Sequence, residues 1–307
     1  MSNNTLDNDG ESLIQQWVNK SIRDSDALYS YLFKLTVVSI VLVSLYPFYY
    51  LFVVAVTPSG RTTDIGLLPA GLDLTSFIEV FQVIPFHRYV INSLVIATLT
   101  TLVVLSLASI AGYVFGRLEF PAKRPLFLLI LVISYFPSAT FLIALFRLLT
   151  GNVSVMGLTS PDLFNTPGAV VVPVTALTLP FAVFLLTIFY SQIPDGLEDA
   201  ARVTGTSRLG ALYRVIMPLS APGLVTAGVL TFISAYNEFF FSFLMVDGSA
   251  ENWSPIVWGL FNYQGQYSAM FDLMAAASLV GILPVAVLVL FAQKKIVSGL
   301  TAGSIKG

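Results

Sequence analysis

A short polar segment, residues 193–218, carries a compact group of charged side chains in an otherwise apolar chain. Its acids, Asp195, Glu198 and Asp199, closely follow Pro194. Proline is favoured at the start of a helix, and acids in the first turns complement the helix dipole. No predicted membrane span carries paired acids that could serve as a catalyst or metal site. The pattern of residues 193–218 predicts a helix whose charged face meets water or a protein partner.

The same segment contains the residues of a tight turn and a second helix. Gly205 suits the left-handed position that ends a helix, and Thr206 or Ser207 can cap the helix that follows. The arginines of that second helix face water, and Pro218 ends it. We therefore expect two short helices over residues 192–217, forming a rigid protrusion suited to docking a soluble partner.

One further acid, Glu238, lies inside an apolar stretch, next to Tyr236 and Asn237. A carboxylate in a membrane segment is costly unless it faces a wet cavity or a partner, so it marks a functional position by default. An interfacial residue whose side chain reaches toward water is the structural alternative. Together the three side chains suit a neutral polyol, which requires hydrogen bonds and aromatic stacking. We predict that they line a substrate pathway.

Most enzymatic chemistry is excluded by the residues that the chain lacks. It has no cysteine, which rules out thiol nucleophiles and thiolate zinc sites. We interpret its single histidine, His87, as an ordinary interfacial residue. Neither the Gly-x-x-x-x-Gly-Lys-Ser/Thr loop nor the His-Glu-x-x-His motif occurs, so we expect no catalytic residue, metal or bound ATP in this chain. The net charge of -2 provides no basic surface for nucleic acid.

Membrane helices must position these segments. Hydrophobic residues make up 56% of the chain and charged residues 10%, against roughly 45–50% and about 25% in a soluble domain. Mean hydropathy is +0.84. A helix needs about 20 apolar residues to cross the hydrocarbon core. The gaps between charges predict an all-α integral membrane protein with six spans, at about 35–57, 91–115, 126–147, 167–191, 218–243 and 270–292.

The spans divide the chain into a leader over 1–34, a six-helix domain over 35–292 and a tail over 293–307. An even number of spans places both termini on one side, and the Lys and Arg residues identify that side as cytoplasmic. Twelve of the 15 basic residues lie on it, in four groups: Lys20, Arg23 and Lys34; Arg117, Lys123 and Arg124; Arg202, Arg208 and Arg214; and Lys294, Lys295 and Lys306.

The leader is polar and has acids before any apolar run, which is not the pattern of a cleavable signal peptide. The first span is therefore expected to act as the membrane signal. Scattered apolar residues in the leader fit either a short surface helix or a mobile tail. Prolines inside the spans predict kinks that serve either opening of the bundle or packing alone: Pro47, Pro137, Pro173, Pro180 and Pro284.

The polar segment resembles the Glu-Ala-Ala loop of ABC importer permeases. In that family, a Gly follows Glu-Ala-Ala after three further residues, and a hydrophobic-x-hydrophobic-Pro group follows later. Asp199 replaces the usual Glu, and Thr204 stands where the family often has Asp. The loop lies between the fourth and fifth of six predicted spans, which makes the match specific. The matching residues are Asp199, Ala200, Ala201, Gly205, Val215, Met217 and Pro218.

Further segments resemble the carbohydrate branch of that family, specifically the second permease of maltose-type importers. Asn92-Ser93 and residues 116–123 resemble that branch's Asn-Ser and Ala-Arg-x-x-Phe-Pro-Gly-Lys. Residues 265–267 and 275–278 resemble its last outer loop and sixth helix. The C-terminal residues resemble its Gly-Leu-Thr-x-Gly-x-x-Lys-Gly tail, which implies a tail at the ATPase interface, whereas a frayed terminus is the alternative. The matching tail residues are Gly299, Leu300, Thr301, Gly303 and Lys306.

The resemblance implies a type I ABC importer permease with the MetI-like fold, multi-pass in the lipid of a prokaryotic plasma membrane. It implies three kinds of partner: a MalF-like second permease, two ATPase subunits that bind ATP and Mg, and an extracytoplasmic sugar-binding protein. The implied activity is ATP-driven import of a disaccharide or oligosaccharide. Residues 194–204 become the coupling helix, and the residues implied in coupling are Pro194, Glu198, Asp199, Ala200, Ala201, Arg202, Gly205 and Pro218.

Alternatives remain open at this point. The first is an ABC permease for a non-sugar polyol such as glycerol phosphate. A secondary transporter or channel would also have six kinked spans, but it predicts intramembrane ion sites and gives no reason for the docking segment. An intramembrane enzyme predicts clustered catalytic residues, which the sequence does not contain. In maltose-type systems the partner permease carries much of the sugar site, so this chain is expected to supply mainly the wall of the pathway.

Overall fold

The computed structural model describes residues 25–58, 60, 65–135, 137–264 and 270–301. This part of the chain is mostly helical, and its strands form a small antiparallel hairpin, β1 (Ser154–Val155) with β2 (Leu158–Thr159). The described residues contain four helices that are long and apolar enough to cross a membrane, or up to six spans if each of two bent helix pairs counts as one, which confirms the predicted all-α architecture. The four long apolar helices are α2 (Ser25–Ala55), α4 (Phe86–Arg117), α7 (Pro167–Ser191) and α14 (Phe271–Thr301).

The predicted span at 126–147 consists of two helices rather than one kinked helix. They are α5 (Lys123–Ser134) and α6 (Ser138–Leu149), and they are bent by 90° relative to each other. Pro137 lies at the break with ψ of 125°, outside the helical region. Proline lacks the backbone N–H that a continuous helix needs, and its ring clashes with the preceding turn. The proline therefore separates two helices here.

The predicted span at 218–243 is too long at its far end. The helix α11 (Ala221–Tyr236) stops before Asn237, and the chain turns into the four-residue helix α12 (Ser242–Met245). The apolar run continues past the break, which is why hydropathy alone extended the span. At its start, α11 is bent by 84° from the helical segment Arg208–Leu219.

The other predicted spans coincide with long helices whose ends differ from the predicted ends by up to ten residues. The helix α2 begins at Ser25, so no boundary falls at residue 34, and the predicted leader helix otherwise lies outside the described residues. The chain remains helical through the prolines of α2, α7 and α14, as expected for kinks: Pro47, Pro173, Pro180 and Pro284.

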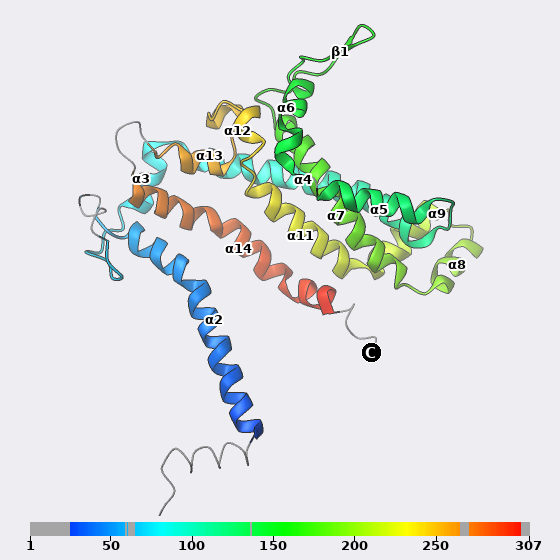
Figure 1. The fold of residues 1–307 in the computed structure, drawn as a ribbon, viewed down its shortest axis with the longest axis horizontal. Coiled ribbons are helices and arrows are strands. Elements are labelled where there is room, and N and C mark those ends of the chain that lie inside the picture. The colour runs from blue at the N-terminus through cyan, green and yellow to red at the C-terminus, as the bar shows by residue number, and fades with distance from the viewer. Residues whose placement is uncertain (1–24, 59, 61–64, 136, 265–269, 302–307) are drawn as a thin grey trace, which may run out of the picture.

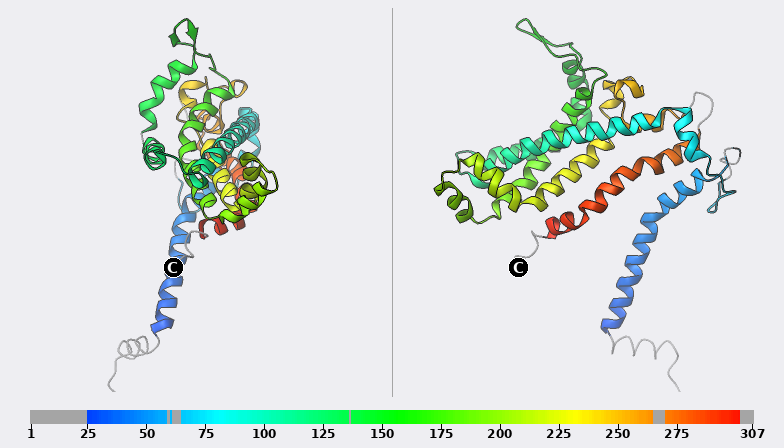
Figure 2. Two further views of the ribbon diagram at one scale, coloured as in Figure 1. Left: turned by 90° about the vertical axis from the view of Figure 1, so that its right-hand side faces the viewer. Right: turned by 180° about the vertical axis from the view of Figure 1, so that it is seen from behind.

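The long helices form a bundle in which α4 packs against α7 and α11, while α14 packs against α11 and α2 (Figure 1). Two clusters of buried side chains hold it together. One surrounds Phe86 and Tyr236, and the other surrounds Leu186 and Tyr190. The helix α2 leans away from the bundle in both views of Figure 2 and buries mainly the residues at its C-terminal end. Most of its apolar side chains are exposed, as expected of a lipid-facing or partner-facing helix.

Short elements gather at the two ends of the bundle (Figure 1). The α13 end carries α3 (Ser76–Val83), α12, a 3-10 turn at Ala250–Asn252 and α13 (Ile256–Phe261). The opposite end, called the α8 end, is formed by one connected segment. Its elements are α8 (Asp195–Val203), α9 (Arg208–Ala211), a π-turn at Leu212–Ile216 and α10 (Met217–Leu219).

Candidate functional site

The helix α8 has the local structure that its residues predict. Pro194 is the N-cap residue, and the helix begins at Asp195. Gly205 adopts φ of +90°, in the region that favours glycine, and turns the chain between the two helices. The Ser207 side chain accepts a hydrogen bond from the backbone N–H of Gly210 at 3.1 Å, which caps α9. The predicted turn and cap are confirmed.

The two faces of α8 differ sharply. Asp199 and Arg202 lie on the exposed face, at 69% and 44% side-chain exposure, and their charged atoms are 3.9 Å apart. Val203 is 89% exposed on the same helix. Among the other predicted coupling residues, Ala200 and Gly205 are exposed and Ala201 is half-buried. The exposed surface combines apolar and charged groups, which suits a protein partner.

Glu198 points the opposite way, into the bundle. Its carboxylate accepts a hydrogen bond from the Tyr113 hydroxyl at 2.5 Å and one from the Arg117 Nε at 2.9 Å. The same guanidinium donates to the Ile193 carbonyl and contacts Asp195 at 2.9 Å. Arg117 is 4% exposed and Glu198 is 9% exposed, measured on their side chains. These contacts anchor α8 to the last turn of α4.

The residue patterns did not identify Arg117 and Tyr113 as site residues. Arg117 was interpreted as a charge that sets membrane orientation and as part of the resemblance over residues 116–123, and Tyr113 was part of an apolar span. Their spacing of four residues places both side chains on one helix face, which is the signal that was available. Removing one partner of a buried ion pair lowers the stability of the folded protein by about 3–5 kcal/mol, because the other charge stays buried without a partner. The anchor therefore fixes how α8 sits on the bundle.

The helical structure that follows Gly205 extends further along the chain than predicted. Pro218 does not end the second helix, because the chain stays helical through Leu219. The proline stands in the first turn of α10, where its missing N–H has little effect. The direction changes at Ser220, between α10 and α11. The α8 end is therefore one helical protrusion followed by a sharp bend into α11.

The structure describes part of the C-terminal tail. Gly299, Leu300 and Thr301 lie in the last turns of α14, which continues past the predicted boundary at residue 292. Gly303 and Lys306 lie outside the described residues, as do residues 265–267 of the predicted last outer loop.

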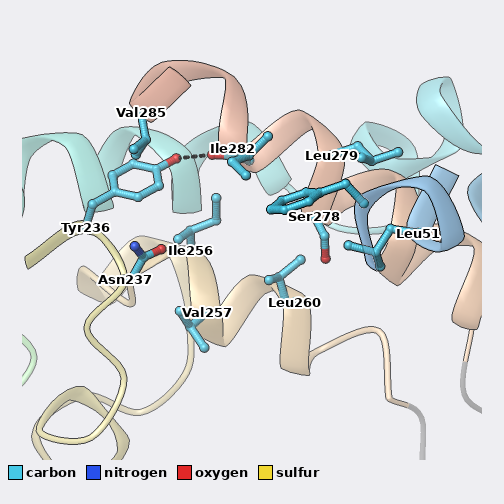
Figure 3. A pocket seen from close by; sticks show the side chains of 12 residues that line it. Leu51, Tyr236, Asn237, Ile256, Val257, Leu260, Ser278, Leu279, Ile282 and Val285 are labelled. Atoms are coloured by element: carbon cyan, nitrogen blue, oxygen red, sulfur yellow. Dashed lines mark hydrogen bonds between the residues drawn. The ribbon is translucent and has the colours of Figure 1, made fainter. Parts of the chain in front are cut away.

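The three predicted pathway residues do not all lie in one place: Tyr236 and Asn237 line a cavity, and Glu238 does not. The ring of Tyr236 and the amide of Asn237 line a cavity of about 280 Å³ between α11, α13 and α14 (Figure 3). The Tyr236 hydroxyl donates to the Gly281 carbonyl at 2.8 Å, and the Asn237 amide donates to the Ile233 carbonyl. The other lining side chains are mostly apolar, among them Leu51, Ile256 and Leu279.

Glu238 does not line this cavity. It lies beyond the end of α11, and its two carboxylate oxygens accept hydrogen bonds from the backbone N–H groups of Phe241 and Ser242, at 2.5 and 3.2 Å. The side chain is buried, and these bonds satisfy both oxygens at the start of α12. In this arrangement Glu238 acts on the backbone that reverses the chain after α11.

The Asn-Ser pair has a defined contact set at the α13 end. The Asn92 amide donates to the carbonyls of Ala250 and Ser254, at 2.8 and 3.1 Å. The Ser93 hydroxyl accepts from the backbone N–H of Ile256 at 2.8 Å. Both side chains are buried. They hold the segment before α13 against α4.

The chain is similar in sequence to known transport proteins. Residues 105–298 match the model of the family described as binding-protein-dependent transport system inner membrane component. The chain is 35% identical to a sulfoquinovosyl glycerol transport system permease protein of Agrobacterium fabrum, over 78% of this chain and 80% of that protein. It is 33% identical to a trehalose transport system permease protein of Mycobacterium tuberculosis, over 86% and 93%. A trehalose/maltose permease protein of Thermococcus litoralis is 32% identical over 87% and 93%.

A solved structure shows the same fold. It is a bacterial ABC transporter involved in the import of the acidic polysaccharide alginate, with a TM-score of 0.72, 19% identity and coverage of 89% of this chain and 98% of that chain. A second structure, with a TM-score of 0.66, holds that kind of transporter in complex with an alginate pentasaccharide-bound periplasmic protein. The expected permease fold is thereby confirmed. The chain belongs to the family of inner membrane components of binding-protein-dependent transport systems, and it is a multi-pass membrane permease of the carbohydrate ABC importer type.

Proposed function

We propose that the chain is one of two permeases in an ATP-driven importer of a disaccharide or oligosaccharide, and that the α8 end lies in the cytoplasm. The observation that carries this proposal is α8 itself: an exposed helix held on the bundle by the buried Arg117–Glu198 pair. Relatives at 33% and 32% identity are described as permeases for trehalose and for trehalose or maltose. These similarities favour a sugar over glycerol phosphate or another phosphorylated polyol.

The proposed mechanism assigns separate roles to the two faces of α8. Asp199, Ala200 and Arg202 contact an ATPase subunit, while Glu198 keeps the helix attached to α4. ATP and Mg are bound by two partner ATPase subunits, since this chain has no P-loop. Closure of the ATPase dimer displaces α8 and favours the outward-open packing of the paired permeases. A MalF-like second permease and an extracytoplasmic sugar-binding protein complete the assembly.

The sugar pathway is proposed to run past Tyr236 and Asn237. The cavity that they line has few polar groups, which supports a wall rather than a complete binding site for a polyol. The partner permease is proposed to provide most of the hydrogen bonds to the sugar. The C-terminal residues from Gly299 to Lys306 are proposed to approach the ATPase interface.

Co-purification combined with transport tests the proposal. The tagged chain should bring down an ATPase and a second permease, and proteoliposomes of the assembly with its binding protein should take up a disaccharide when ATP is present inside. Asp199→Arg should weaken ATPase capture at least about tenfold, because it reverses a charge on the docking face. Glu119→Arg is the matched control, since Glu119 is an exposed acid that pairs only with Lys123 in the described contacts.

Each outcome separates the competing functions. Uptake of glycerol phosphate with no uptake of disaccharide would transfer the assignment to the polyol alternative. Uptake without an ATPase, driven by an ion gradient, would favour a secondary transporter. Full retention of the ATPase by Asp199→Arg, as by Glu119→Arg, would place the docking surface elsewhere on the chain.

A further inference from the structure

The helix α4 differs from the other three long helices in the described part of the chain. Prolines interrupt the backbone hydrogen bonding of α2, α7 and α14, whereas the 32 residues of α4 include none. At about 1.5 Å per residue, α4 is about 48 Å long. It runs from the α13 end to the α8 end of the bundle (Figure 1). Because its hydrogen-bond ladder has no proline break, α4 is the long helix best suited to move as one rigid rod.

Buried polar contacts attach one end of α4 to the coupling helix. Arg117 is the last residue of α4, and Tyr113 lies one turn before it. Both donate to Glu198 on α8, and Arg117 also reaches Ile193 and Asp195. Separating these groups would leave a buried guanidinium and a buried carboxylate without partners, which is unfavourable. A displacement of α8 therefore draws the end of α4 with it.

Buried polar contacts also attach the other end of α4, to residues 248–256 before α13. The Tyr89 hydroxyl donates to the Gly248 carbonyl at 2.8 Å. The Asn92 amide and the Ser93 hydroxyl bind the backbone of the same segment, as described above. The three α4 side chains are buried. A shift of this end of α4 would break their bonds unless the segment moves with it.

We propose that α4 transmits the displacement of α8 to residues 248–256 at the opposite end of the bundle, with Arg117 and Asn92 as positioning residues at its two ends. This inference rests on the proposed function, because it takes α8 as the helix moved by the ATPase. The competing route runs through α7, which is joined to α8 along the chain. Pro173 and Pro180 each remove a backbone hydrogen bond inside that helix, which makes it easier to bend than α4. By thermodynamic linkage, a binding protein that displaces residues 248–256 acts back on α8 through α4.

A double-mutant cycle tests this transmission in the reconstituted assembly with its binding protein. The measured quantity is the ratio of ATP hydrolysis with sugar-loaded binding protein to hydrolysis without it. Arg117→Met and Asn92→Ala should each lower this ratio at least about fivefold, the lower range of allosteric coupling. The two residues are 25 positions apart, about 37 Å along the helix, so direct interaction between them is excluded. The double variant should lower the ratio no further than the more severe single variant, because one broken end already interrupts the path.

The absence of cysteine allows a second measurement at each end. A spin label at Glu251→Cys reports on the α13 end, and one at Val203→Cys reports on α8. Both positions are exposed. Arg117→Met should remove the ATP-dependent spectral change at residue 251 and keep the change at residue 203, as should Asn92→Ala. Arg117 lies at the opposite end of α4 from Asn92, so a purely local structural defect at Arg117 would not reach residue 251.

Control variants and a conservative variant distinguish loss of transmission from misfolding. Lys123→Gln removes an exposed pair near Arg117, and Thr98→Ala removes a hydroxyl that bonds only within α4 in the described contacts. Both should retain the full ratio. Arg117→Lys keeps the charge beside Glu198 and should restore part of the ratio if Arg117→Met fails to assemble. Multiplicative effects in the double variant, or an unchanged signal at residue 251 in Arg117→Met, would overturn the inference. An unmodified assembly with no sugar uptake would instead overturn the proposed function.

Discussion

Glu198 and Asp199 are adjacent in α8 but lie in opposite environments, and the proposed function of α8 depends on this contrast. Glu198 is buried against α4, whereas the neighbouring Asp199 is exposed. Successive residues of a helix point about 100° apart, so one acid can anchor the helix while the next meets a partner. The sequence placed both acids in the first turns of a helix. The direction of each side chain depends on how that helix lies on α4, which local patterns do not specify.

Gly205 offers a residue-scale test of the turn between α8 and α9. Its φ of +90° is strained for any residue with a Cβ atom, and most for a β-branched one. Gly205→Val should abolish sugar uptake, because α8 and α9 lose their relative orientation, while membrane insertion is retained. Uptake in proteoliposomes and the amount of chain in the membrane fraction measure the two effects.

Gly196→Ala is the matched control for Gly205→Val. Gly196 lies in α8 with no atom within 4 Å of an added Cβ. Alanine should stabilise the helix by about 0.5–1 kcal/mol and leave uptake unchanged. Undiminished uptake in Gly205→Val would show that the turn has no part in coupling.

Glu238→Gln distinguishes a backbone role from a sugar-binding role. Glutamine keeps one acceptor oxygen but loses the charge-assisted bonds to Phe241 and Ser242. The variant should be less stable by about 1–3 kcal/mol, with the KM for sugar unchanged. Thermal unfolding of the purified assembly and uptake kinetics provide the two measurements. Glu79→Gln, at an exposed acid of α3, is the control. A KM raised tenfold with unchanged thermal stability would assign Glu238 to the pathway instead.

At the scale of elements, close packing of α4 against α7 holds the α8 half of the bundle together. A Cβ added at Gly112 would lie 2.9 Å from the Leu186 Cβ and 3.3 Å from the Leu186 backbone carbon. Small residues at such contacts allow membrane helices to approach closely. The absence of a side chain at Gly112 therefore has a structural reason that its sequence neighbourhood does not reveal.

Gly112→Ala should destabilise the bundle by about 1–3 kcal/mol, because overpacking forces the two helices apart. The lower melting temperature of the detergent-solubilised chain would measure the effect. Gly66→Ala is the control, since nothing lies within 4 Å of a Cβ built there. Equal melting temperatures for the two variants would contradict the packing argument.

The stability of the loops at the α13 end should depend on pH. Partial burial acts to raise the pKa of the Asp247 carboxyl, but hydrogen bonds from Ser249, Asn252 and Asn165 outweigh it and hold the pKa below 3.8. A depressed pKa stabilises the folded loops fully above the unfolded value. That contribution is lost as the pH falls from 3.8 through the lower folded pKa.

Hydrogen exchange of residues 247–252 checks this dependence. Protection should be constant near neutral pH and should weaken below about pH 4, after correction for intrinsic exchange rates. Asp247→Asn should show reduced protection at neutral pH and little further change on acidification. Protection in the unmodified chain that rises as the pH falls would contradict the assigned sign.

Two helix boundaries could not be predicted from the sequence pattern. The prolines in α2, α7 and α14 leave their helices continuous, whereas Pro137 separates α5 from α6 by 90°. A proline frees carbonyl groups in either case, and neighbouring helices decide whether the chain can continue. The end of α11 at Tyr236 was also missed, because the residues after it are apolar and the Glu238 carboxylate supports the turn through backbone N–H groups.

At the scale of the whole molecule, apolar side chains cover much of the outside. Examples are Leu35 and Val43 on α2, at 65% and 74% exposure. Patches of this extent are rare on soluble monomers. Lipid or the partner permease is the environment that such a surface requires, in agreement with the membrane family of the chain.

Single cysteines at opposite ends test the orientation. Met156 on the hairpin and Val203 on α8 are 99% and 89% exposed, and the chain has no native cysteine. The positive-inside distribution predicts that Val203 lies in the cytoplasm. A membrane-impermeant maleimide should label Met156→Cys in intact cells and Val203→Cys only after permeabilisation. The reverse labelling pattern would invert the topology and remove the basis for ATPase docking at α8.

The amino-acid sequence by itself determined the membrane environment, the six apolar segments, the side expected for the termini and the two-helix protrusion between the fourth and fifth spans. These properties follow from local composition, charge distribution and turn chemistry, each of which acts over a few residues. Only the tertiary structure decided that Arg117 and Tyr113 hold Glu198, that Asn92 and Ser93 hold residues 248–256, and that Glu238 binds backbone rather than lining the cavity. Each of these contacts is set by how separate elements pack together, which a residue's neighbours in the chain do not specify.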